Sequence, residues 1–187
     1  MRKFPVVYLL VEAPIDNLKL TEAADRLSSA QGFSEPIVVM SDRPDDLVAF
    51  VDGKYRTLTG RISRGLAGVS LGGDAALRTA IKQPDVFSSL YLLSASLVDA
   101  TVALTDADAA NLRRLYNTAI TVGTGDAALP MNRRLHDAMM RLKIAHYYEE
   151  FDGRYADLVA ERVATRLVPF FSRNLLAPAN PTSPAVQ

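Results

Sequence analysis

The sequence predicts an α/β fold, a three-layer sandwich built on a mostly parallel sheet of about six strands. Short apolar runs rich in β-branched residues alternate along the chain with longer segments of helical periodicity. Runs that are apolar at every position are typical of strands buried on both faces, as in parallel sheets. Alternation of strands with helices gives such a sheet with helices on both faces. The predicted strands are residues 5–11, 37–41, 64–69, 90–96, 119–122 and 144–151.

The segments between these strands have helical patterns. The first has apolar residues at helical spacing over residues 20–27 and ends at Gly32. The second opens at Pro44 and carries apolar positions as far as Leu58. Thr105 is followed three residues later by Asp108, which marks the start of a capped helix. Further helices are predicted over residues 75–83, 130–142 and 156–176.

The chain is predicted to form one domain. Its 187 residues are enough for a single substantial core. There is no internal repeat and no linker, so we expect residues 1–176 to form the domain. Residues 177–187 are rich in proline, alanine and serine, and predict a mobile C-terminal tail.

Composition restricts the function classes. The formal net charge is zero, which argues against a nucleic-acid or anionic-membrane partner. There is no cysteine and there are only two histidines, so we expect no metal site and no cofactor. No apolar run approaches the ~20 residues of a membrane span. The run Val6–Val11 is short and is followed by Glu12, which favours a core strand over a signal peptide and predicts a cytoplasmic location.

One motif organises the chain. Gly68, Ser70 and Gly72 fit G-x-S-x-G, between a predicted strand and a predicted helix. Glycines at these positions let a sharp turn pass close to neighbouring backbone, and the turn exposes the serine hydroxyl beside the amides of a helix N-terminus. The same pattern also occurs in tight strand-to-helix turns that have no chemistry.

Several stretches, taken together and in order, resemble the esterase D-like branch of the α/β-hydrolases, which includes S-formylglutathione hydrolases, feruloyl esterases and mycolyltransferases. They are Lys3–Leu10, Tyr55–Thr57, the motif around Ser70, Ala75–Arg78, Gln83–Phe87, Gly123–Asp126, Asn132–His136 and Tyr148–Phe151. The resemblance implies a minimal α/β-hydrolase core that lacks the family's usual first strands and its cap. It also implies a carboxylic-ester hydrolase that uses no cofactor and acts on small ester substrates.

The family uses a serine, an acid and a histidine in that chain order. Carried over to this sequence, the nucleophile is Ser70 and the acid is Asp126, although Asp126 also suits a turn in the loop that begins at Gly123. The slot of the histidine holds Tyr155. A tyrosine phenol ionises near pH 10, so it is a poor base at neutral pH.

Two other histidines could in principle substitute. His146 is predicted at the start of the strand whose far end should carry the base, so we expect it at the opposite edge of the sheet. His136 lies ten residues after Asp126 in a predicted helix that runs away from the carboxyl edge of the sheet. We therefore expect neither side chain to reach Ser70.

The oxyanion side also departs from the family. The Leu71 amide suits one donor and the amide near Ala13 the second. Where the family usually has His-Gly or Asp-Gly, this chain has Val11 and Glu12, and a Glu12 carboxylate would oppose the charge of the transition state. Asp74 adds another acid close to the turn.

Three readings of the function remain open. The intact motif favours a slow serine ester hydrolase. The loss of both the histidine and the oxyanion glycine favours an inactive relative that binds or assembles. An acyl-transfer or lyase activity without the histidine is a third. Without the family's first strands, the strand Ile37–Ser41 becomes an apolar sheet edge, and such edges pair with other chains. This predicts a homo-oligomer that forms through that edge or through the last helix.

Overall fold

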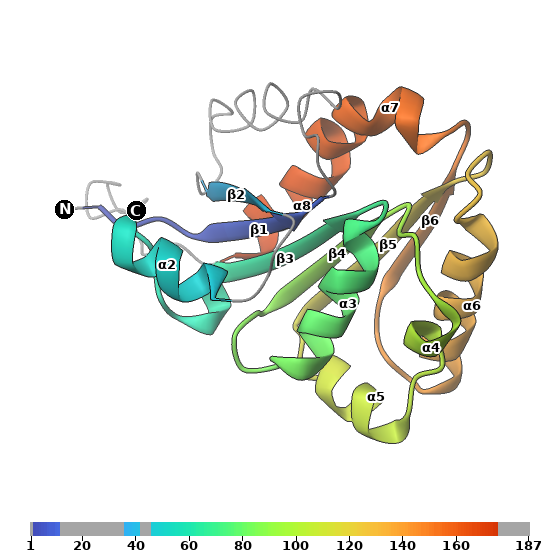
Figure 1. Ribbon diagram of the computed structural model, residues 1–187, viewed down its shortest axis with the longest axis horizontal. Helices are drawn as coiled ribbons and strands as arrows, with labels where there is room; N and C mark the ends of the chain where they lie inside the picture. The colour runs from blue at the N-terminus through green and yellow to red at the C-terminus, as the bar shows by residue number, and fades with distance from the viewer. Residues whose placement is uncertain (1, 12–35, 42–45, 176–187) are drawn as a thin grey trace, which may run out of the picture.

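The computed structural model describes residues 2–11, 36–41 and 46–175. A sheet of six strands forms its centre, and every neighbouring pair of strands is parallel (Figure 1). The strand order is β2-β1-β3-β4-β5-β6. The strands are β1 (Val6–Leu10), β2 (Ile37–Ser41), β3 (Arg64–Val69), β4 (Ser89–Leu93), β5 (Asn117–Gly123) and β6 (Tyr147–Phe151).

Helices connect the strands and cover the sheet (Figure 1). They are α2 (Leu47–Lys54), a 3₁₀ turn η2 (Arg61–Ser63), α3 (Gly72–Lys82), α4 (Asp99–Val102), α5 (Asp106–Leu112), α6 (Leu129–Arg141), α7 (Tyr155–Arg162), a π-helical turn η3 (Val163–Leu167) and α8 (Val168–Asn174). None of the helices in the described ranges combines the length and the hydrophobicity of a transmembrane span.

Two hydrophobic clusters, one on each face of the sheet, make up the core. Successive side chains of a strand point to opposite faces, so Tyr8 and Leu10 enter one cluster and Val7 and Leu9 the other. Helices α2, α3, α5 and α6 close the first cluster, and α7, η3 and α8 close the second. The predicted α/β three-layer sandwich is therefore confirmed.

Local capping fixes the start of α5. The Thr105 hydroxyl accepts from the Asp108 amide at 3.2 Å, and the Asp108 carboxylate accepts from the Thr105 amide at 2.9 Å. This is the reciprocal capping box that the sequence predicts.

The predicted end of α2 was wrong. The helix stops at Lys54, and Tyr55 has extended backbone angles. The next residues pair with the segment before β1 instead: the Leu58 amide donates to the Phe4 carbonyl at 2.8 Å, and the Phe4 amide donates to Arg56 at 2.9 Å. A tertiary pairing thus replaces the helical hydrogen bonds that the apolar spacing indicated.

Two predicted strands were too long. The strand that was expected to reach Ser96 ends at Leu93, because Ser94 turns into the left-handed region at φ 44°. The strand that was expected from Ile144 begins at Tyr147. The Ile144 amide donates to the Met139 carbonyl at 2.8 Å, so this residue completes the end of α6.

The last predicted helix is interrupted by η3. Pro169 lies within the first turn of α8 and has no amide hydrogen, so the Thr165 carbonyl lacks its usual helical donor. The π turn η3 accommodates this missing helical hydrogen bond. The predicted helix over residues 20–32, Glu12, Ala13 and the predicted tail 177–187 lie outside the described residues.

Candidate active site

Ser70 occupies a sharp turn between β3 and α3. Its φ of 50° lies in the left-handed region, which costs a residue other than glycine free energy unless the surroundings enforce it. Val69 ends the strand directly before Ser70, and Gly72 begins the helix two residues later. The predicted strand–turn–helix arrangement is present, with the serine at its apex.

The two glycines of the motif allow the turn to pack. A Cβ at Gly68 would lie 2.6 Å from the Gly73 Cα and 2.7 Å from the Ala76 Cβ. A Cβ at Gly72 would overlap the backbone carbonyl of Leu10 in the neighbouring strand. Any side chain at either position would push α3 away from the sheet.

The loop after β4 holds the turn in place. The Ser70 amide donates to the Leu93 carbonyl at 3.1 Å, and the Ser96 amide donates to the Ser70 carbonyl at 2.8 Å. The same loop contains Ser94, whose hydroxyl donates to Asp126 Oδ2 at 2.6 Å. Ser70 and Asp126 therefore both contact the segment 93–96, at the carboxyl edge of the sheet.

Asp126 is held by three donors. Its Oδ2 accepts from the Ser94 hydroxyl and, at 3.0 Å, from the Gly123 amide. Its Oδ1 accepts from the Tyr155 amide at 2.9 Å. Together these hydrogen bonds fix the orientation of the carboxylate. A carboxylate has about four acceptor sites, so one remains for a further donor.

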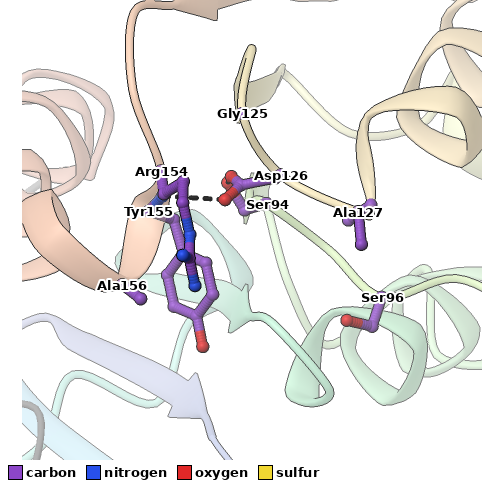
Figure 2. Close-up of a pocket in the computed structure, with 9 residues that line it drawn as sticks. Ser94, Ser96, Gly125, Asp126, Ala127, Arg154, Tyr155 and Ala156 are labelled. Atoms are coloured by element: carbon purple, nitrogen blue, oxygen red, sulfur yellow. Dashed lines mark hydrogen bonds between the residues drawn. The ribbon is translucent and has the colours of Figure 1, made fainter.

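A pocket of about 330 Å³ opens beside Asp126 (Figure 2). Ser94, Ser96, Arg154 and Tyr155 contribute to its lining. Figure 2 shows Ser96 across the pocket from Tyr155, whose ring extends away from the Asp126 carboxylate although its amide donates to that group. The structure thus brings Asp126 and Tyr155 together at this pocket. Ser70 does not line the pocket, and its turn is linked to the lining by the hydrogen bond from the Ser96 amide.

The two histidines lie at the opposite edge of the sheet. His136 Nδ1 and His146 Nε2 are 2.8 Å apart, and the His136 ring stacks on Tyr148 with 4.2 Å between centroids. His146 directly precedes β6, whereas Tyr155 follows the carboxyl end of that strand. The strand between them is roughly 17 Å long, at 3.3 Å per residue. Burial lowers the pKa of His146 below its usual 6.5.

The remaining candidates differ in position. Leu71 is exposed, and its amide has no hydrogen-bond acceptor among residues 2–11, 36–41 and 46–175, so it is available to an oxyanion. Asp74 pairs with Arg78 and accepts from the Val98 amide at 3.3 Å. It does not line the pocket beside Asp126.

A match to a family model shows which protein family the chain belongs to. The model described as "Putative esterase" matches residues 44–157, more than half of the chain, and this range contains Ser70, Asp126 and Tyr155. The chain belongs to this esterase family. The esterase D-like resemblance found in the sequence is therefore confirmed.

Solved esterase structures share the fold. A ferulic acid esterase is 20% identical, with a TM-score of 0.78 over 93% of this chain and 86% of that one. The S-formylglutathione hydrolase of Staphylococcus aureus is 15% identical, with a TM-score of 0.70 over 92% and 85%. The ferulic acid esterase of Anaeromyces mucronatus, in complex with ferulic acid, is 16% identical, with a TM-score of 0.67 over 92% and 79%. No curated protein matches the chain in sequence.

Several residues that line this esterase's pocket were missed in the sequence, among them Ser94 and Arg154. Ser94 was placed inside a strand, although the small residues after Leu93 mark the end of the apolar run. Arg154 was not singled out in the sequence, yet it lines the pocket beside Tyr155. In the part of the chain that the structure describes, no group of three or more histidine, aspartate or glutamate side chains could hold a metal ion.

Proposed function

We propose that this esterase is a serine carboxylic-ester hydrolase that acts slowly on small acyl esters through Ser70. The observation that carries the proposal is the left-handed turn at Ser70, which is packed against β1 and is tied by the segment 93–96 to Asp126. A strained residue held by its surroundings at a sheet edge is a feature of functional sites. Family membership makes ester hydrolysis the matching reaction class.

In this proposal the Ser70 hydroxyl attacks the ester carbonyl and the hydroxyl proton passes to solvent water. The Leu71 amide, at the N-terminus of α3, donates to the oxyanion that forms. The Ala13 amide is the second proposed donor. Collapse of this intermediate breaks the ester C–O bond and releases the alcohol, which takes its proton from water. The acyl-enzyme then reacts with a second water to release the acid and restore the free serine.

The proposed rate is low because no imidazole stands between Ser70 and Asp126. Enzymes of this type that lose one member of the triad keep roughly 10³–10⁴-fold catalysis over water, from the oxyanion donors and from substrate binding. Asp126 would act in this chain by holding the loop of Tyr155 and by favouring positive charge in the pocket.

Ser70→Ala tests the proposal with p-nitrophenyl acetate as substrate. We expect the initial rate of the purified protein to fall at least ~10-fold, toward the rate in buffer, because the nucleophile is lost. Ser172→Ala, on α8 and outside the pocket, is the matched control and should keep the wild-type rate. Equal rates for wild type and Ser70→Ala would refute the proposal.

The alternative is an inactive relative that serves as a binding or assembly module. The position of His136 and His146 at the far edge of the sheet favours it, since neither side chain can act on Ser70. The same experiment separates the two functions. A rate that does not depend on Ser70 supports the module and excludes the hydrolase.

We also propose that the protein forms a homo-oligomer through β2. This strand lies at an edge of the sheet, pairs only with β1 among the described strands, and is half-buried at every position. Unpaired edges of apolar strands invite pairing with another chain. Light scattering at micromolar concentration should give a multiple of 20.4 kDa, and a monomer mass would contradict this prediction.

A cytoplasmic location stays a sequence-based prediction.

A further inference from the structure

A second cavity, of about 400 Å³, lies between the sheet and α8. It shares no lining residue with the pocket beside Asp126. Its floor comes from Tyr91 in the middle of β4, Ala119 in the first half of β5 and Tyr147 at the start of β6, so it lies toward the edge of the sheet opposite the candidate active site. Its volume is in the range of small-molecule sites.

A row of three residues in register forms the floor. Tyr91 pairs with Ala119, and Ala119 pairs with Tyr147. The small Ala119 side chain between two tyrosines leaves the hollow. The Tyr91 hydroxyl lies 3.1 Å from the Thr121 hydroxyl, and burial raises the pKa of Tyr91 to about 12, so its phenol stays neutral. The Tyr91 ring meets the edge of Phe170 at 5.3 Å, which gives the cavity an aromatic wall.

The π turn supplies one side of the cavity. Two consecutive residues of this turn, Thr165 and Arg166, line the cavity. Pro169, which cannot donate the helical hydrogen bond to Thr165, also lines the cavity. Single π turns inside helices are frequently found at functional sites, and here the turn borders a cavity that the proposed ester hydrolysis does not use.

The mouth of the cavity carries excess positive charge. Arg166 lines the cavity, and its guanidinium lies 3.6 Å from the Glu149 carboxylate, which is not itself part of the lining and accepts from Arg162 at 2.9 Å. Arg173 also lines the cavity and is exposed, and no carboxylate of the described residues pairs with it. Two guanidinium groups, those of Arg166 and Arg173, thus line the cavity, and only Arg166 has a carboxylate beside it, so the rim attracts an anion.

We propose that this cavity binds a small planar carboxylate, an aromatic or similarly flat acid. The ring would lie over Ala119, between Tyr147 and Phe170. The carboxylate would accept from the guanidinium groups of Arg173 and Arg166, which match its two oxygens. The proposal is independent of catalysis at Ser70.

Titration of the ¹⁵N-labelled full chain with 2-naphthoate, followed by NMR, tests the proposal. We expect saturable shifts at millimolar concentration, centred on the amides of Ala119, Tyr147 and residues 165–174. The neutral amide 2-naphthamide and the ring-free anion acetate should each bind at least ~10-fold more weakly. The first lacks the negative charge and the second lacks the aromatic ring. The same shifts should occur in Ser70→Ala.

Arg173→Gln should weaken 2-naphthoate binding about 10-fold, because it removes the guanidinium that has no competing carboxylate. Arg141→Gln, at the exposed end of α6, removes the same charge elsewhere and should leave binding unchanged. Thr165→Trp should fill the cavity from its exposed side and abolish the shifts. Shifts confined to Gly125, Asp126 and Tyr155, equal binding of the amide and the acid, or no saturable shift would each overturn the proposal.

Discussion

Tyr155→His is expected to raise the rate of p-nitrophenyl acetate hydrolysis by about 100-fold, which is the lower end of the range for a positioned general base. Tyr155→Asp should not give this gain, because it only adds charge. The Tyr155 amide donates to Asp126, so the backbone at position 155 lies beside the acid, and a histidine there needs a rotamer that differs from the one of the tyrosine ring, which extends away from the carboxylate. Asp126 keeps one acceptor site for an imidazole N–H, which would orient the ring and stabilise its charged form. The gain should appear mainly in kcat, and it should decrease at pH values below the pKa of the new histidine.

Tyr116→His is the matched control for this gain. Tyr116 is exposed and lies before β5, at the edge of the sheet away from Ser70. Its replacement introduces the same side chain without access to the candidate site, so the rate should not change. The double variant Tyr155→His with Ser70→Ala should lose the gain, since the new base needs the serine. A rate for Tyr155→His equal to wild type would show that position 155 is not the slot of the base.

Gly72→Ala is expected to destabilise the fold by about 3 kcal/mol or more, a large value for one methyl group. The added Cβ would overlap the Leu10 carbonyl and would lie 2.8 Å from the Val11 amide nitrogen. Both are backbone atoms, so no side-chain rotation relieves the overlap, and α3 must move away from β1. Urea unfolding followed by circular dichroism measures the loss.

Gly60→Ala provides the comparison, because a Cβ at Gly60 meets no atom within 4 Å and its φ of −73° suits any residue. We expect a change within about 0.5 kcal/mol. Similar free energies of unfolding for Gly72→Ala and Gly60→Ala would mean that the turn at Ser70 is not tightly packed.

The strands and the turn at Ser70 were predictable because their signals are local. Val6 to Leu10 is apolar at every position, and the structure buries all five residues between two layers. The spacing of Gly68 and Gly72 around Ser70 encodes a close approach of backbone that needs no knowledge of distant residues. The position of His146 also followed from the direction of one strand.

Other features depend on contacts between segments far apart in the sequence. The helix α2 ends early because residues 55–58 pair with Phe4, more than 50 positions before them. Ser94 leaves the strand to reach Asp126, 32 positions later. Each residue alone fits its predicted element, and only the tertiary hydrogen bond overrides the local preference.

Labelling with a fluorophosphonate probe, followed by mass spectrometry of the modified peptide, tests the central claim most directly, because the probe reacts with an activated serine whatever the natural ester. The account predicts covalent label on Ser70 in the wild type, faster labelling in Tyr155→His and none in Ser70→Ala. An unmodified Ser70 in the folded wild-type protein, or label on another serine, would contradict it.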